Sequence, residues 1–285
     1  MSESNIEMDN GSTSQKNTGE PSIVYKNIDV KTELESLVKL LDGKIYKEEE
    51  IAMEELHQYL IEDDGCWALS DNFLNFVGRI FKDMSFSPET RIHLIRALAC
   101  AALNDDIIIL LHQDRKEHTL MNFANDFDKQ SPDEQRAWGT FMCNLFENPS
   151  SSEWLLYISE WQYNNQNISN LTVTTKVTVH CLLSNCPTLK DIGTSILFNL
   201  AIKDVKTVVF DDVAVELTMA ILQFFNSNPS EVLVYRALRA LVRFMEVSKD
   251  VGSFIQMIGP HPKTFLGMSE RIDELVNLVI SKIPV

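Results

Sequence analysis

One kind of helix recurs along this chain, and it limits what the chain can fold into. The clearest copy runs from Glu231 to Phe244, where apolar residues follow helical spacing while Arg236, Arg239 and Arg243 interrupt them. One face of such a helix packs against protein, and the arginines have to point elsewhere. Similar apolar helices are predicted at 95–103, 138–146 and 193–201.

The spacing of these helices indicates a repeat. Leu98, Phe141, Ile196 and Leu241 occupy matching places in them and are 43, 55 and 45 residues apart. This interval is close to the period of armadillo and HEAT units, each of which buries its apolar face only against its neighbours. The sequence therefore predicts an all-α, armadillo/HEAT-like helical solenoid over residues 22–285, with a concave face that binds partners.

Start signals and periodicity place the other helices. Ser87 and Ser131 are each followed by proline, the pattern of an N-cap before the first helical position. The strip Ile23 to Tyr25 is expected to lie extended on the body, 164–170 is expected to be a polar loop, and 205–209 a connector. Helices are expected at 30–41, 48–61, 71–84, 88–103, 132–146, 152–163, 173–183, 188–202, 213–225, 231–246, 249–257 and 269–283.

Composition narrows the class of protein. The chain has 285 residues, of which 45% are hydrophobic, enough for a substantial core, and its formal net charge is −16. That charge argues against nucleic acid and against an acidic membrane as partners. Residues 1–21 are polar and are expected to be a flexible tail without the features of a secretion signal. Five cysteines are expected to stay reduced, in the cytoplasm or the nucleus.

No pattern in the sequence favours an enzyme. Cys100 and Cys143 lie inside apolar helices and are expected to be buried thiols, while His180, Cys181 and Cys186 are too close in sequence to face one another on a helix. His112 and His118 match no zinc spacing, and phosphate-binding glycine motifs are absent from the sequence. We therefore expect no catalytic residue, no metal and no cofactor.

Polar residues inside the apolar helices are the remaining signal. Asn144 and Asn199 hold equivalent places in two of them, and a buried amide is costly unless it is hydrogen-bonded. Each could bond a neighbouring carbonyl and lock adjacent repeats, or the two could form a ladder that holds the backbone of an extended peptide. Arg236 follows Tyr235 on a well-packed helix, so it needs either a carboxylate partner or an open groove.

The order of several short motifs resembles one known family. An extended lead-in before the first helix, at 21–37, is followed by Phe141-Met-Cys-Asn-Leu-Phe146, then by Thr194-Ser-Ile-Leu-Phe-Asn199, then by Tyr235-Arg-Ala-Leu-Arg-Ala-Leu241 with Gly259, and by a closing helix at 271–283. This order is similar to that of the PUL domain, the C-terminal armadillo-like domain of phospholipase-activating protein and its ubiquitin-fusion-degradation relatives. The resemblance covers nearly all of the chain beyond residue 21.

The resemblance implies a non-enzymatic adaptor. Family members bind the acidic, aromatic C-terminal tail of the AAA+ segregase valosin-containing protein in a basic concave groove, in ubiquitin-dependent protein degradation. Carried over to this chain, the anchor is Arg236, with Asn144 and Asn199 lining the groove, and we add Arg239 and Lys176 as peptide-binding residues. On this basis Arg236→Ala should abolish tail binding without unfolding the domain.

Two features of the sequence depart from the family or compete with this hypothesis. Thr140 stands where the family has an arginine, and Arg136 lies one turn earlier. The net charge of −16 also opposes an acidic ligand at long range. The alternative is an armadillo scaffold that docks a basic or helical partner protein on its acidic outer surface.

Overall fold

The protein is mostly helical. The computed structural model describes residues 19–62, 70–203, 209–258 and 261–283. Its α-helices are α1 (Val30–Leu41), α2 (Lys47–His57), α3 (Asp71–Lys82), α4 (Pro88–Ala101), α5 (Ile108–Gln113), α6 (Thr119–Asn125), α7 (Pro132–Asn144), α8 (Pro149–Leu155), α9 (Asn170–Leu183), α10 (Pro187–Ile202), α11 (Val209–Phe225), α12 (Glu231–Val247), α13 (Asp250–Met257) and α14 (Glu270–Lys282). Within the described ranges, no helix is long and apolar enough to cross a membrane.

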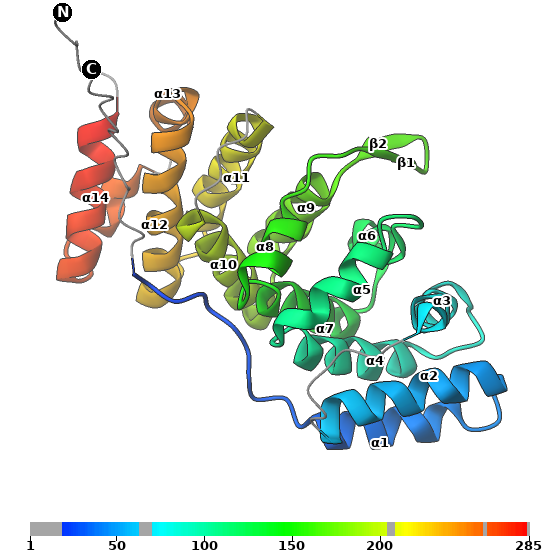
Figure 1. Cartoon of the computed structure of the whole chain (residues 1–285). Coiled ribbons are helices and arrows are strands. Elements are labelled where there is room, and N and C mark those ends of the chain that lie inside the picture. Colours follow the sequence, from blue (N-terminus) through cyan, green and yellow to red (C-terminus); the bar gives the residue numbers. More distant parts are fainter. Residues whose placement is uncertain (1–18, 63–69, 204–208, 259–260, 284–285) are drawn as a thin grey trace, which may run out of the picture.

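The helices pack in two rows (Figure 1). In the first row, α1, α4, α7, α10, α12 and α14 each pack against the next, and in the second row α3, α6, α9, α11 and α13 do the same. Contacts of α9 with α10 and of α11 with α12 join the rows. Helices that are neighbours in space are therefore close in sequence all along the chain.

The repeated apolar helices form the first row. Leu98, Phe141, Ile196 and Leu241 lie on α4, α7, α10 and α12, and each is fully buried. The prediction that these helices bury matching positions is confirmed. Apolar packing along both rows is continuous, so burial of these side chains is the main force that holds neighbouring helices together.

A close approach between the rows depends on Gly193. A Cβ atom at this position of α10 would lie 2.7 Å from the backbone nitrogen of Leu182 and 2.8 Å from the Cβ of Cys181, both on α9. Such distances are far below a normal contact, so only glycine lets these two helices pack this closely.

The predicted start signals are confirmed at α4 and α7. Ser87 Oγ accepts a hydrogen bond from the Thr90 amide, and Ser131 Oγ accepts one from the Glu134 amide. The Glu134 carboxylate in turn accepts a bond from the Ser131 amide, which completes a capping box. The same carboxylate pairs with Arg91 of α4, so the cap also ties two neighbouring helices of the first row together.

The prediction was wrong between α8 and α9. The helix expected at 152–163 ends at Leu155, and an antiparallel hairpin follows, formed by β1 (Trp161–Tyr163) and β2 (Gln166–Ile168). Asn164 and Asn165 have φ angles of 49° and 62°, which suit a two-residue hairpin turn. The loop predicted at 164–170 is therefore this turn, β2 and the start of α9.

Two further predictions need comment. The short helices α5 and α6 were missed, because runs of six and seven residues are too short to show helical periodicity. Most of the connector predicted at 205–209 lies outside the described residues, and Val209 already belongs to α11.

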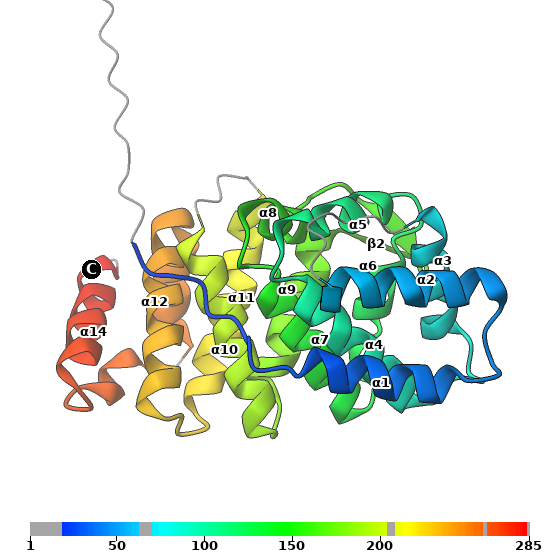
Figure 2. The same cartoon turned by 60° about the horizontal axis from the view of Figure 1, so that its bottom comes forward.

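The N-terminal part of the structure is an extended segment, residues 19–29, which we call the strap. It crosses α12, α10 and α7 before the chain enters α1 (Figure 2). The prediction that residues 23–25 lie extended on the body is confirmed by their contacts with α7 and α10. Most of the predicted tail, residues 1–18, lies outside the described residues, whereas Glu20 contacts α12.

Candidate functional site

The strap is held to the first row by two asparagine side chains. Asn199 Oδ1 accepts from the Ile23 amide at 2.7 Å, and its Nδ2 donates to the Ile23 carbonyl at 2.8 Å. Asn144 makes the same two bonds with Tyr25: its Oδ1 accepts from the Tyr25 amide at 2.7 Å, and its Nδ2 donates to the Tyr25 carbonyl at 2.9 Å. Each amide thus satisfies both backbone polar groups of one strap residue, as a neighbouring β-strand would.

The geometry of this ladder follows from the helix positions. Asn144 and Asn199 are both fully buried, on the adjacent helices α7 and α10. Ile23 and Tyr25 are two residues apart, so in an extended segment they present their backbone groups to the same side. Asn144 also donates to the Ala99 carbonyl of α4 at 2.8 Å. Both alternatives from the sequence are therefore present, because Asn144 links neighbouring helices and holds an extended backbone.

Arg236 has a carboxylate partner within the chain. Its Nη1 lies 2.8 Å from Asp191 Oδ1 and 2.9 Å from Ser195 Oγ, both on α10. The Tyr25 hydroxyl donates to the other oxygen of Asp191 at 2.5 Å, and burial together with nearby negative charge raises the pKa of Tyr25. Only 15% of the Arg236 side chain is exposed, so the guanidinium supports the strap and leaves little surface for another ligand.

Arg239 also contacts the strap. Its Nη2 lies 2.7 Å from Glu20 Oε2, while the Tyr235 hydroxyl donates to Glu20 Oε1 at 2.6 Å. Burial alone would raise the pKa of Glu20, but the hydrogen bonds from Tyr235 and Arg239 outweigh it and lower the pKa. The guanidinium of Arg271 on α14 lies 4.5 Å from the centre of the Tyr235 ring, which links α12 to α14 beside the start of the strap.

Lys176 does not join the other candidate residues. It lies on α9, in the second row, where its Nζ contacts the Asn125 carbonyl and is 3.2 Å from Asp128 Oδ1. The structure therefore groups four of the five predicted peptide-binding residues on α7, α10 and α12, and it places Lys176 apart from them. Its helix, α9, belongs to the second row, whereas the other four residues lie on helices of the first row.

A cavity of about 330 Å³ lies beside the end of the strap. Strap residues form one wall, and residues of α1, α4, α7 and α10 form the rest. Both residues that departed from the family pattern, Arg136 and Thr140, line it, and Arg96 was not predicted as a site residue although it belongs to the repeated apolar helix at 95–103. The complete lining is Asn27, Ile28, Asp29, Glu33, Arg96, Arg136, Ala137, Thr140 and Thr188.

The arginines of this cavity are already paired. Arg96 Nη1 lies 3.2 Å from Glu33 Oε1, and Arg136 contacts Asp133 one turn away on α7. These pairs leave 38% and 34% of the two arginine side chains exposed. Exposed ion pairs are weak, so Arg136 can exchange Asp133, which is itself exposed, for a carboxylate of a ligand at small cost. Arg96 keeps its buried partner Glu33, which His93 also contacts, and offers only the exposed part of its guanidinium.

The two buried cysteines, on α7 and α9, are unsuited to nucleophilic chemistry, whereas hydrogen bonds from the Leu189 and Thr188 amides lower the pKa of Cys186 at the start of α10. Cys143 and Cys181 are fully buried, and burial raises the pKa of both thiols, which keeps them protonated at neutral pH. His180 packs edge-on against the Phe127 ring and has no described hydrogen bond to a cysteine. Among the residues that the structure describes, no three His, Cys, Asp or Glu side chains are grouped to hold a metal ion.

Comparison with protein-family models, with curated proteins and with solved structures gives no significant match to this chain. Fold and site together define a mostly helical protein in which two rows of helices carry an extended segment of the same chain. The resemblance to a family therefore comes from the order of motifs in the sequence alone.

Proposed function

We propose that this chain is a PUL-type armadillo solenoid that acts as a non-enzymatic adaptor. In this proposal it binds the C-terminal tail of the AAA+ segregase valosin-containing protein during ubiquitin-dependent protein degradation. The tail binds on the side of the first row that carries the strap.

The packing of the helices supports a solenoid. The first-row helices carry the repeated apolar positions, and each contacts the next helix of its row. Contacts between neighbouring units in sequence order are the property that distinguishes a repeat protein from a bundle closed around one centre.

The observation that carries the binding proposal is the asparagine ladder. Asn144 and Asn199 each hold both backbone polar groups of a strap residue, so this side of the row is built to accept an extended chain. Because the strap already fills the ladder, we place the tail beside the strap, over the cavity that contains Arg96 and Arg136. Two partly exposed guanidinium groups there suit the acidic and terminal carboxylates of such a tail.

The candidate residues then divide into two groups. Arg96 and Arg136 contact the tail. Asn144, Asn199, Arg236 and Arg239 act indirectly, because they fix the strap that forms one wall of the cavity. Arg236→Ala should still weaken tail binding, through a loosened Tyr25, but by less than loss of the two contacting arginines.

A titration with a fluorescent peptide tests this function. The peptide carries the C-terminal residues of the segregase, a scrambled peptide is the control, and the salt concentration is physiological. We expect saturable binding of the true tail and at least about a tenfold weaker affinity for the double variant Arg96→Gln, Arg136→Gln, because charge-assisted bonds are lost. Lys249→Gln, just before α13 in the second row, removes an exposed positive charge away from both the cavity and the strap and should leave the affinity unchanged. Equal binding of both peptides, or full affinity of the double variant, would exclude this site.

The charge of the chain favours a second candidate. With a net charge of −16, a basic partner protein is attracted to the acidic outer surface. Capture of such a partner should fall steeply as salt is raised and should not change in the Arg96→Gln, Arg136→Gln variant. Capture that does not depend on salt would count against this scaffold role.

A further inference from the structure

Arg115 differs from every other arginine of the chain. Each of the others forms an ion pair with a carboxylate, from Arg79 with Glu49 to Arg271 with Glu231. Arg115 has no ion pair with any carboxylate in the described part of the chain, and its guanidinium instead lies 4.6 Å from the centre of the Tyr157 ring. Arg115 is exposed, so its positive charge is available to a negatively charged group of a ligand.

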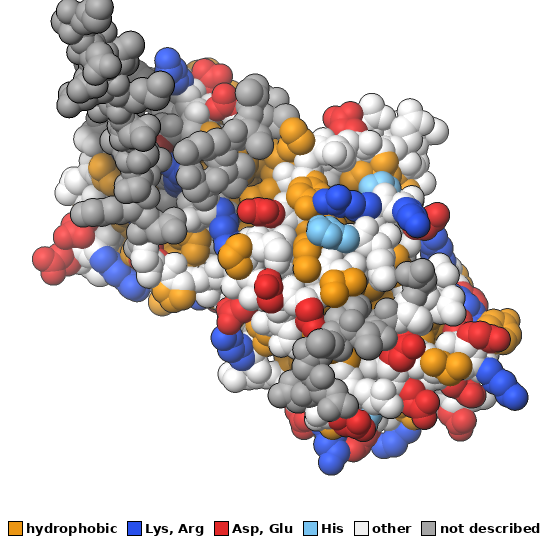
Figure 3. Space-filling model, in the orientation of Figure 1, with side chains coloured by type: hydrophobic (Ala, Val, Ile, Leu, Met, Phe, Trp, Pro, Cys, Tyr) orange, Lys and Arg blue, Asp and Glu red, His pale blue; other side chains and the backbone are white. Residues whose placement is uncertain are grey.

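Arg115 lines a pocket of about 550 Å³, a volume typical of ligand sites. The pocket lies between the loop after α5, the end of α8, the segment before β1 and the first residue of α9, at a distance from the strap (Figure 1). Figure 3 shows basic and histidine side chains beside hydrophobic ones on this face. The lining is Asp114, Arg115, His118, Trp154, Leu156, Tyr157, Ile158, Ser159, Glu160 and Asn170.

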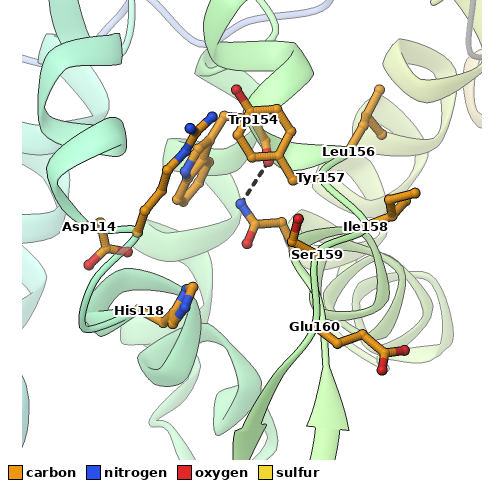
Figure 4. Close-up of a pocket in the computed structure, with 10 residues that line it drawn as sticks. Asp114, His118, Trp154, Leu156, Tyr157, Ile158, Ser159 and Glu160 are labelled. Atoms are coloured by element: carbon orange, nitrogen blue, oxygen red, sulfur yellow. Dashed lines mark hydrogen bonds between the residues drawn. The ribbon is translucent and has the colours of Figure 1, made fainter.

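The walls of the pocket are aromatic and aliphatic. Trp154 and Tyr157 lie at one side of the pocket, Leu156 and Ile158 at another, and His118 faces them from below (Figure 4). The His118 ring stacks on Trp161 of β1 with ring centres 3.9 Å apart, which fixes its position. These walls offer contact area for a large apolar side chain.

Two polar groups in the pocket lack partners. Asn170, only 5% exposed, donates its Nδ2 to the Trp154 carbonyl at 2.7 Å, the dashed bond in Figure 4. Its Oδ1 has no hydrogen-bond partner among the described residues, so it is available to accept from an N–H or O–H of a ligand. The Ser159 hydroxyl likewise forms no hydrogen bond within the described ranges.

The two acidic side chains of the lining do not neutralise Arg115. Asp114 is turned toward the start of α6, where its oxygens accept from the Leu120 amide at 3.2 and 3.3 Å. Burial raises the pKa of Asp114 to about 7, so the carboxyl is partly uncharged at neutral pH. Glu160 is exposed, and Figure 4 shows both acids at the edges of the pocket, away from Trp154 and Tyr157.

We propose that this pocket binds the C-terminal residue of a peptide that ends in a large apolar or aromatic side chain. The terminal carboxylate pairs with Arg115, the amide N–H of the last residue donates to Asn170 Oδ1, and the side chain packs on Leu156 and Ile158. A cation, an acceptor and an apolar wall are the three features that such a terminus requires. The site is separate from the strap-side cavity and stands or falls independently of the adaptor function.

The experiment uses the full chain and three small probes. N-acetyl-L-phenylalanine carries all three features, N-acetyl-L-phenylalaninamide lacks the carboxylate, and 3-phenylpropionate lacks the amide N–H. Tryptophan fluorescence and two-dimensional NMR report binding. We expect saturable binding of the first probe with a Kd on the order of 1 mM, and roughly tenfold weaker binding of the amide. Binding of 3-phenylpropionate should be weaker by a smaller factor.

Two variants decide whether the signal comes from this pocket. Arg115→Gln should reduce the affinity for N-acetyl-L-phenylalanine to that of the amide, whereas Lys116→Gln, the same charge change on the exposed neighbour, should not. Ser159→Phe, on an exposed segment, should block the pocket without unfolding the chain. No saturation by about 10 mM probe, equal affinity for acid and amide, or unchanged binding in Arg115→Gln would each overturn the proposal.

Discussion

The strap side and the Arg115 pocket contain the same kinds of side chain in opposite situations. On the strap side, Arg236 meets Asp191, and both polar atoms of Asn144 find backbone partners in the strap. In the pocket, Arg115 has only an aromatic ring, and Asn170 has one of its two polar atoms paired among the described residues.

The paired polar groups of the strap side stabilise the fold, whereas the unpaired ones of the pocket are available to bind a ligand. A buried polar group that is fully hydrogen-bonded within the chain contributes to one fold, because any other arrangement leaves it unsatisfied. A polar group that faces a cavity and stays unpaired contributes nothing to the fold and can be satisfied by a ligand. The strap side therefore binds its own chain first, and the pocket is the better place to look for a ligand of unknown identity.

The largest effect that tests this comparison is expected from Asn144→Ala. The change removes the partners of the Tyr25 amide, the Tyr25 carbonyl and the Ala99 carbonyl, and it should lower the free energy of unfolding by about 3 to 5 kcal/mol. Asn199→Ala removes only the two bonds to Ile23 and should cost about half as much. Urea denaturation of both variants measures the difference.

A loss below about 1 kcal/mol for Asn144→Ala would show that the ladder does not stabilise the fold. Equal losses for the two variants would show that the hydrogen bond from Asn144 to the Ala99 carbonyl does not contribute to stability. Asn226→Ala, just after α11, serves as a control that changes an exposed asparagine elsewhere.

On the pocket side, Asp114→Asn should stabilise the protein at high pH. Burial raises the folded-state pKa of Asp114 from 3.8 to about 7, and this outweighs the amides of Leu120 and Thr119 and the charge of Lys82, which lower it. The protonated form is therefore favoured by folding, so its stabilising contribution is complete below pH 3.8 and is lost as pH rises through about 7. Asparagine keeps a neutral acceptor and should gain about 2 kcal/mol at pH 8 relative to pH 4.

The measurement for Asp114 is the difference in unfolding free energy between the variant and the parent across that pH range. Using a difference removes the titration of the other carboxylates, which both proteins share. A difference that stays constant from pH 4 to pH 8 would contradict the view that ionisation of the buried Asp114 carboxyl destabilises the folded protein.

A smaller effect is expected from Tyr25→Phe. The change keeps the ring in place but removes the hydroxyl that bonds Asp191 and Ser195, while Arg236 stays paired with Asp191. We expect a loss of about 1 kcal/mol and faster proteolysis of the strap. Tyr46→Phe is a suitable control, because Tyr46 is exposed at the start of α2. A strap that is cleaved at the same rate in both variants would mean that Tyr25 does not anchor it.

Much of the strap side could be predicted from the sequence, for a physical reason. Asparagine within an apolar helix must be hydrogen-bonded, and an arginine on the same kind of helix must be paired. The sequence alone therefore marks Asn144, Asn199 and Arg236 as residues that need partners. What the sequence could not show is that the partner is the chain itself, because Glu20 and Tyr25 reach α12 and α10 across more than 160 residues.

The pocket could not be predicted, because it depends on elements that the sequence patterns hide. The segment that ends in β1 was taken as helix, and α5 and α6 are too short for their periodicity to appear. The two asparagines at 164–165 were the available signal, since such a pair favours the two-residue turn of a hairpin. Even with the hairpin in place, nothing local marks Arg115 as unpaired, because that depends on which carboxylates fold near it.

The smallest effect is expected from Glu20→Gln, and it tests whether the strap opens at its start. The pKa of Glu20 is lowered in the folded protein, so the carboxylate contributes stability above its ordinary pKa of 4.5, and this contribution is lost as pH falls below that value. Because the ion pair with Arg239 is partly exposed, the change should cost only about 0.5 kcal/mol at pH 7. Amide hydrogen exchange of Glu20, Ser22 and Ile23 should be faster in the variant at pH 7 and should approach that of the parent once the pH is low enough to protonate Glu20 of the parent. If exchange is already fast in the parent at pH 7, the start of the strap is open without any change, and the strap side presents free polar groups as the pocket does.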